Sequence, residues 1–270
     1  ADLDTKIQVE ESSDEDTIRM DIAGTEMMTL SSSGAVITTS GNEDTLTLTS
    51  TDADASFGPH LRMYRNSGSP ADNDLLGDIE FEGRNDNSQD VVYGRLFAKI
   101  SDASDGTEDG IMRFDIMKAG SLSDVLTFTP DELVVNDGSY DYDFRVESNG
   151  NTHALFVDGG NNRVLFGTDT AVTTSTTGKL QMSGTDNAGS TLTLGRFSAN
   201  ANSANLSFVK SRNASVGGNT VVADGDNLGS ITFHASDGSD TVPMAAKIFA
   251  EVDGTPGSND MPGRLTFFTT

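Results

Sequence analysis

The sequence predicts an all-β protein built from antiparallel sheets, and three observations support this prediction. Apolar and polar residues alternate with a period of two in most of the apolar segments, as half-buried strands require. Glycine, serine, threonine, asparagine and aspartate, which favour tight turns, fill the stretches between these segments. Several segments return in the same order later in the chain, which indicates an internal duplication. We therefore expect duplicated antiparallel sheets or small sandwiches joined by short β-hairpin connectors.

Two stretches, residues 1–40 and 137–178, are predicted to be β connectors. In the second, two alternating runs flank Asn149 and Gly150, a strong hairpin signal. The first has a similar order of short alternating runs separated by glycines at positions 24 and 34. Because isolated hairpins are only marginally stable in water, we expect each connector to pack against other copies of the chain.

The duplication defines two larger predicted β repeat units, residues 41–136 and 179–270. The matching pairs are 45–48 with 191–194, 61–65 with 206–210, 76–81 with 228–233, 95–100 with 247–252, and 110–114 with 263–267. Each segment alternates, so each unit is predicted to hold four or five antiparallel strands. The core positions Ile79, Phe81, Leu96 and Phe114 should then correspond to Ile231, Phe233, Ile248 and Phe267.

Charge and composition exclude several classes of function. The chain has 17 basic and 42 acidic side chains, for a formal net charge of −25, which would repel nucleic acid and anionic membranes. It has no cysteine, so disulfides and thiolate chemistry are excluded. No apolar run reaches the ~18–20 residues of a membrane span, and the first residues do not resemble a signal peptide. We expect no nucleic-acid partner and no membrane insertion.

No catalytic, cofactor-binding or metal-ligating residues are predicted, and the chain is not expected to be an enzyme. Its three histidines, His60, His153 and His234, lack a second histidine at metal-ligand spacing and do not match one another across the duplication. Phosphate-binding loops and nucleophile elbows are absent from the sequence. Each histidine is therefore interpreted as an exposed or turn residue.

Calcium is the one cofactor weighed as an alternative. Acidic side chains gather in two loops, and flexible oxygen-rich loops can bind this ion. These residues are Asp102, Asp105, Glu108 and Asp109 in the first loop, and Asp224 and Asp226 in the second. The spacing does not fit an EF-hand, so solvated acidic turns are the favoured interpretation. Asn205 and Asn213 begin glycosylation sequons, a motif frequent by chance.

Several motifs resemble connector repeats of bacteriophage tail-fibre and related virion proteins, which are especially common in marine phages. They are residues 24–34 (GTEMMTLSSSG), 144–151 (FRVESNGN) and 155–164 (LFVDGGNNRV), together with both ends of the chain. The sequence departs from the pattern where such a connector usually closes on Gly-Ile-Gly-Thr, which is ITTS at 37–40 and LFGT at 165–168. A C-terminal self-cleaving chaperone domain is not recognised.

The resemblance implies a homotrimeric, intertwined segment of a virion fibre, which could be part of a longer chain. Its implied role is to space or present host-recognition surfaces on the virion surface, outside the cell. Its implied partners are other virion proteins and a host-surface glycan or protein. A bacterial extracellular filament or adhesin built from the same β modules is the alternative, followed by a secreted carbohydrate-binding module or enzyme.

Overall fold

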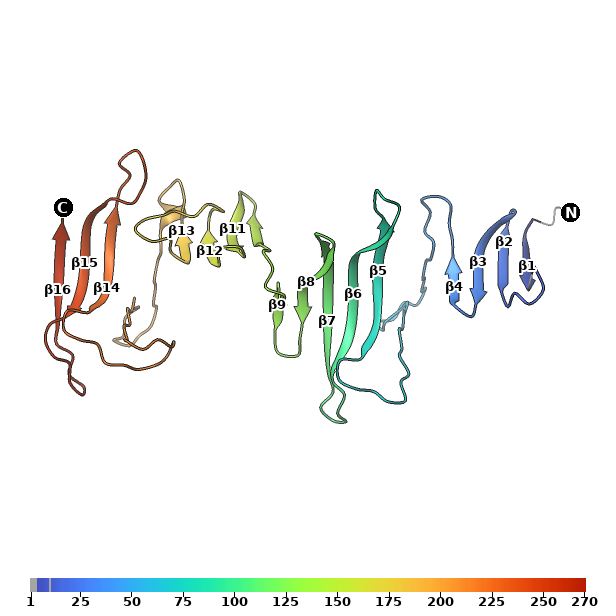
Figure 1. Ribbon diagram of the computed structural model, residues 1–270, viewed down its shortest axis with the longest axis horizontal. Coiled ribbons are helices and arrows are strands. Elements are labelled where there is room, and N and C mark those ends of the chain that lie inside the picture. Colours follow the sequence, from blue (N-terminus) through green and yellow to red (C-terminus); the bar gives the residue numbers. More distant parts are fainter. Residues whose placement is uncertain (1–3, 10) are drawn as a thin grey trace. The chain divides into compact units, whose positions relative to one another are not determined.

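The computed structural model describes residues 4–9 and 11–270, and its regular structure is almost entirely β (Figure 1). Within this described part, the exception is a short 3-10 turn, η1, at Ala188–Ser190. The prediction of an all-β fold with antiparallel sheets is therefore confirmed. The chain divides into two compact units, Ala1–Ser67 and Gly68–Thr270. The finer boundaries between connectors and repeats stay a prediction.

The first unit contains a four-stranded antiparallel sheet in chain order. Its strands are β1 (Lys6–Val9), β2 (Ile18–Ile22), β3 (Thr25–Ser31) and β4 (Gly34–Ile37). The β2–β3 hairpin turns at Ala23 and Gly24, whose φ angles of 51° and 74° fit a two-residue loop with positive φ at both positions. Directly paired residues share a face, which places Ile7, Met20, Met28 and Ile37 in one apolar row.

The second unit begins with a five-stranded antiparallel meander. Its strands are β5 (Leu75–Arg84), β6 (Asp90–Asp102), β7 (Asp109–Lys118), β8 (Ser121–Phe128) and β9 (Leu133–Val135). The register brings one apolar residue from each strand into a row across the sheet: Ile79, Leu96, Phe114, Leu126 and Val135. The alternation seen in the sequence therefore produces one apolar face and one polar face.

A four-stranded sheet follows, made of β10 (Phe144–Ser148), β11 (Asn151–Asp158), β12 (Arg163–Phe166) and β13 (Leu180–Met182). The predicted hairpin at Asn149 and Gly150 joins β10 to β11. Strand β13 pairs with β12 in the parallel direction, which the antiparallel prediction did not include. The chain between these two strands covers one face of the sheet, where Leu165 is completely buried.

The last sheet contains β14 (Asn227–His234), β15 (Met244–Val252) and β16 (Gly263–Thr269), again antiparallel. Its strand pairing repeats that of β5, β6 and β7. The row Ile231–Ile248–Phe267 corresponds to Ile79–Leu96–Phe114, and the row Gly229–Ala250–Leu265 corresponds to Gly77–Ala98–Met112. The register therefore places these residues at equivalent positions, but most of the predicted core residues among them are exposed rather than in a core.

Two features of the repeat units differ from the prediction within the single described chain. Residues 45–48, 61–65, 191–194 and 206–210 were expected to be strands, but the described chain assigns none of them to a sheet. Residues 179–270 contain four strands, as predicted, but β13 pairs with β12 of the preceding sheet, so the last sheet has three. The physical reason is the same in both cases, because alternation predicts an extended backbone but a strand also needs a partner. Within Gly68–Thr270, strands make extensive contact only inside their own sheet, so the sheets form no sandwich.

Candidate functional site: the open apolar faces

The polar face of the β5–β9 sheet is closed by an arginine–aspartate cluster. Asp115 is only 1% exposed, and both of its carboxylate oxygens accept hydrogen bonds from arginines. Arg95 Nη2 donates to Oδ2 at 2.8 Å, and Arg113 Nε donates to Oδ1 at 2.8 Å. The two guanidinium groups also lie over the ring of Phe97, at 4.7 and 4.9 Å from its centroid. Phe97 is consequently buried on the polar side of the sheet.

The electrostatics of this cluster indicate a structural role. Burial raises the pKa of Asp115, but the hydrogen bonds from Arg113 and Arg95 outweigh burial, so the pKa of this carboxyl lies below its ordinary value. The hydrogen bond to Asp115 raises the pKa of Arg113 in turn. Both groups stay charged near neutral pH, so Asp115 has no tendency to act as a general acid or base. The cluster lies on the polar face and joins β6 to β7.

The opposite, apolar face of the same sheet is left uncovered. Eight of its large side chains are at least 39% exposed. They are Ile79, Phe81, Met112, Phe114, Ile116, Phe128, Leu133 and Val135. A soluble monomer rarely exposes a contiguous apolar patch larger than a few hundred Å², and larger patches mark interaction sites.

Each of the other three sheets also leaves one apolar face exposed. In the β10–β13 sheet, the covered face buries Phe156 and Leu165 beneath a loop held by Gln181, whose side chain bonds both main-chain groups of Val172 at 2.8 and 3.0 Å. The exposed apolar residues of its other face are Phe144, Val146, Phe166, Leu180 and Met182. In the β14–β16 sheet they are Ile231, Phe233, Leu265 and Phe267.

The β1–β4 sheet repeats this arrangement with ion pairs on its polar face. Lys6 lies 3.4 Å from Asp21, and Arg19 lies 2.7 Å from Glu26. The apolar face is exposed at Ile7, Val9, Ile18, Met20, Leu30 and Ile37. All four sheets thus present an open apolar face, and we treat these faces together as the candidate functional site.

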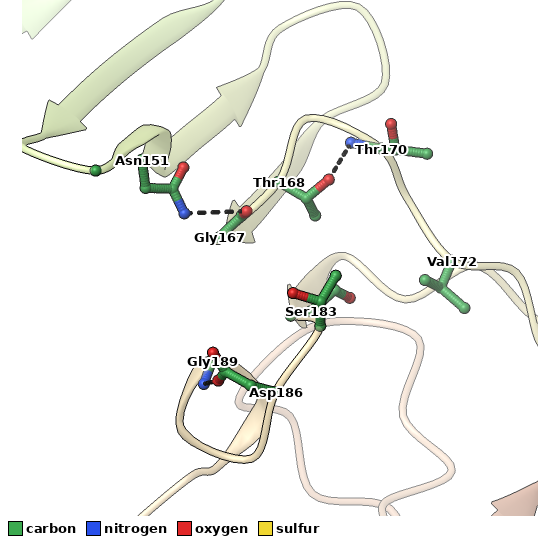
Figure 2. Close-up of a pocket in the computed structure, with 11 residues that line it drawn as sticks. Asn151, Gly167, Thr168, Thr170, Val172, Ser183, Asp186 and Gly189 are labelled. Carbon is green, nitrogen blue, oxygen red and sulfur yellow. Dashed lines mark hydrogen bonds between the residues drawn. The ribbon is translucent and has the colours of Figure 1, made fainter.

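A polar hollow of about 570 Å³ lies beside the β10–β13 sheet, and its lining residues mostly bond one another (Figure 2). Asn151 Nδ2 donates to the Gly167 carbonyl at 3.2 Å, the Thr170 amide donates to Thr168 Oγ1 at 3.0 Å, and the Gly189 amide donates to Asp186 Oδ1 at 2.7 Å. Its described lining residues include no aromatic ring.

A second, apolar hollow of about 340 Å³ lies on the open face of the β14–β16 sheet. Its lining includes Phe208, Gly229, Ile231 and Leu265. A Cβ atom added at Gly229 would lie 2.6 Å from the Cβ of Phe208, so only glycine allows this close approach. The segment that contains Phe208 thus reaches the open apolar face of the unit.

The histidines singled out in the sequence do not come together as a site. His60 stacks on Phe57 with ring centroids 6.0 Å apart. His153 Nε2 lies 3.7 Å from Asp169, and His234 Nδ1 lies 2.9 Å from the Val242 carbonyl oxygen. Among the described residues, no three His, Asp or Glu side chains are grouped so that they could hold a metal ion.

The acidic loops weighed for calcium use carboxylates in local hydrogen bonds. Asp102 accepts from the Ser104 amide at 2.8 Å, and these bonds lower its pKa. Asp224 accepts from the Gly254 amide at 2.7 Å, and Asp226 is paired with Arg212 at 2.7 Å. The hydrogen bond from Arg212 is the main reason why the pKa of Asp226 is also lowered. This geometry fits turn stabilisation.

The comparisons with known proteins return two solved structures. No protein-family description matches the sequence, and no curated protein is similar to it. The carboxy-terminal domain of the bacteriophage T5 L-shaped tail fibre is 13% identical, with 81% of this chain and 80% of that chain covered and a TM-score of 0.33. The same domain with its intra-molecular chaperone domain is 14% identical, with 83% of this chain and 56% of that chain covered and a TM-score of 0.31. At these scores, the argument for function rests on the residues of this chain.

In the part of the chain that the structure describes, no helix has the length and apolar character needed to cross a membrane.

Proposed function

We propose that the chain is a structural segment of a phage tail fibre or a related virion appendage, assembled as a homotrimer on the virion surface. It spaces or presents host-recognition surfaces and performs no chemistry of its own. The observation that carries this proposal is that each of the four sheets leaves an apolar face exposed within the described chain. A second copy of the chain is the natural cover, since it offers a matching apolar face at every sheet.

Assembly would also stabilise the β10–β13 sheet, in which burial within one chain offsets little of the entropic cost of ordering the backbone. Phe144 and Val146 are exposed on its open face, and full burial of such a side chain contributes about 1.5–3 kcal/mol. Ordering the backbone costs about 1–2 kcal/mol per residue, so a small sheet gains little stability from one covered face alone. Copies that bury their open faces against one another add the free energy of burying these apolar side chains.

Three copies suit the sheets better than two. Each sheet ends in strands with unpaired edges, which invite aggregation. Two sheets packed face to face leave those edges open, whereas three sheets around a common axis can approach one another both face to face and edge to edge. Three copies sum to a formal charge of −75, three times −25, and salt screens the acidic outer faces.

The resemblance of the connector motifs to tail-fibre repeats supports placing this assembly on a virion. There it would contact other virion proteins, with any host-surface glycan or protein bound by loops or by another part of the fibre. A bacterial extracellular filament or adhesin subunit is the second candidate, because open apolar sheet faces serve a filament equally well.

Light scattering of the purified chain at micromolar concentration tests the proposal. One chain has a mass of 28.4 kDa, and we expect three times this mass. A well-folded monomer, with a β-type circular dichroism spectrum, would contradict it. Negative-stain images of the native source then separate the candidates, since a phage appendage and a free bacterial filament differ at sight.

A further inference from the structure

Four segments of the chain have the sequence of strands but lie outside every sheet. They are residues 45–48, 61–65, 191–194 and 206–210. Figure 1 draws no strand arrow between β4 and β5 or between β13 and β14. The one regular element there is the short 3-10 turn η1. The first and third segments each read Thr-Leu-Thr-Leu, and Thr191 has the φ and ψ of an extended strand, −107° and 123°.

The main chain of these segments makes no ladder within the described part of the chain. Residues 45–48, 61–64, 191–194 and 206–210 form no main-chain hydrogen bond to another segment. Native proteins pair more than about nine in ten buried main-chain groups, so these groups must stay in water or find a partner elsewhere. The main-chain donors and acceptors of these residues are therefore not used by any strand of the described chain.

Their apolar side chains are largely exposed. Leu46, Leu48, Met63 and Leu61 are exposed in the first unit of the duplication. Their counterparts Leu192, Leu194, Phe208 and Leu206 are exposed in the second. The pattern alternates apolar and polar residues with the period of a strand that has one buried face. Both repeats thus keep the same incomplete element at the same place, ahead of β5 and β14, which are edge strands of their sheets.

We infer that these four segments are β strands whose ladder partners are supplied by other copies of this chain. The inference rests on the proposed homotrimer and adds the elements that join its copies. A copy of the chain fits better than an unrelated partner because the segments occur twice. A copy presents both complementary sites at the right separation by symmetry, whereas another protein would need a matching duplication.

The charges of the segments also favour another copy of this chain as the partner. The segment at 61–65 carries Arg62 and Arg65, and the segment at 206–210 carries Lys210, in a chain with only 17 basic residues against 42 acidic ones. The segments at 45–48 and 191–194 carry no charge. Pairing with an acidic copy therefore brings opposite charges together, or none, and avoids the repulsion expected between two chains of formal charge −25.

The contact between Phe208 and Gly229 places one segment where copies would meet. Phe208 lies against the β14–β16 sheet on the open apolar face, in the hollow formed with Ile231 and Leu265. The strand at 206–210 therefore already lies at the surface proposed to be buried by assembly. A neighbouring copy that packs on this face can reach its main chain.

Hydrogen exchange of the wild-type assembly, read by mass spectrometry, tests the inference. We expect amides of 45–48 and 191–194 to exchange at least about 100-fold more slowly than unprotected amides, as ladder amides in stable sheets do. A trimer whose segments exchange at unprotected rates would overturn this inference and leave the proposed function standing. A folded monomer would overturn the proposed function itself.

Proline variants distinguish segments that pair through main-chain hydrogen bonds from segments that are only buried by their side chains. Thr47→Pro and Thr193→Pro each remove one donor and should weaken trimer formation at least about tenfold, because proline is excluded from paired strand interiors. Ala53→Pro, in the turn-rich stretch that follows the first segment, is the matched control and should leave the mass unchanged. Trimers as stable as wild type in both threonine variants would contradict the pairing.

Discussion

The β5–β7 strands and the β14–β16 strands pair in the same register. The residues of their apolar faces are similar in the two sheets, whereas the residues of their opposite faces are not. On the open apolar face, the second sheet repeats the first nearly residue for residue. The pairs are Gly77 and Gly229, Ile79 and Ile231, Phe81 and Phe233, Leu96 and Ile248, Ala98 and Ala250, Met112 and Leu265, and Phe114 and Phe267. Each pair keeps either the residue or its size and apolar character.

The covered polar face has diverged between the two sheets. The positions of Arg95, Arg113 and Asp115 in the first are held by Lys247, Thr266 and Phe268 in the second. Lys247 lies over the ring of Phe249 at 4.1 Å, so one cation–π contact remains where the first sheet has two arginines and a buried carboxylate. The second sheet instead has an exposed ion-pair group around Arg264.

This difference indicates which face is constrained from outside the chain. A face that only needs covering within the chain can be covered in several ways, and the two sheets use different side chains. A face that must match other copies has less freedom, because a change there alters the contact in every copy at once. The shared apolar face is therefore the expected assembly surface, and the polar face is a local matter of stability.

The largest effect is expected from a charge placed on the shared face. Phe114→Asp and Phe267→Asp, at equivalent positions, should each prevent trimer formation, because a buried unpaired carboxylate is far more costly than the ~1.5–3 kcal/mol of lost burial. Light scattering measures the mass. The two variants should behave alike if the two sheets assemble in the same way.

Glu80→Ala provides the control for these variants. Glu80 pairs with Arg95 across β5 and β6 and lies on the polar face, so its loss should leave the trimer mass unchanged. A variant such as Phe114→Asp that still forms trimers would break the distinction between the two faces.

A smaller effect is expected from removing the charge of the covered cluster. Asp115→Asn should lower the free energy of unfolding by about 1–3 kcal/mol, since hydrogen bonds to a charged group are lost and both arginines remain. The trimer mass should not change. Urea unfolding at fixed protein concentration measures the loss, and Phe268→Ala, at the equivalent position of the second sheet, provides the comparison. Equal losses of unfolding free energy in the two variants would show that the Asp115 cluster does not stabilise the first sheet more than Phe268 stabilises the last one.

Acid should weaken the first sheet through the same carboxylate. The pKa of Asp115 is lower in the folded chain than its ordinary value, because the arginine hydrogen bonds outweigh burial. Its stabilising contribution is therefore complete above about pH 4 and is lost as the pH falls through the lower, folded value. Urea midpoints at pH 7 and pH 3 should differ less in Asp115→Asn than in wild type. An unchanged difference would assign the acid sensitivity to other carboxylates.

Sequence alone was sufficient for the elements whose partners are nearby in the same chain. Alternation and duplication predicted that Ile79, Leu96 and Phe114 share one face and correspond to Ile231, Ile248 and Phe267, and the register agrees. Strands that follow one another in a meander pair locally, so the pattern of each strand and its turn fix the register.

The errors arose where the partner is distant or outside the chain. Residues 45–48 alternate as well as any true strand, but alternation cannot tell whether a partner exists. The parallel pairing of β13 depends on a loop held by Gln181 and Val172, a contact with no local signature. Asp115 was missed because it is one of 42 acidic residues, and only the register shows that it lies opposite Arg95.

The smallest effect is expected from Arg264→Ala in the second sheet. Arg264 Nε lies 3.1 Å from Glu251 and Nη1 lies 2.9 Å from Asp253, so the geometry resembles that of the Asp115 cluster. The arginine side chain is half exposed, however, and water and salt screen exposed ion pairs. The urea midpoint should therefore shift much less than in Asp115→Asn, and the shift should vanish in high salt. A loss as large as that of Asp115→Asn would mean that the second sheet depends on a polar-face cluster as much as the first does, and the contrast between the two covered faces would then fail.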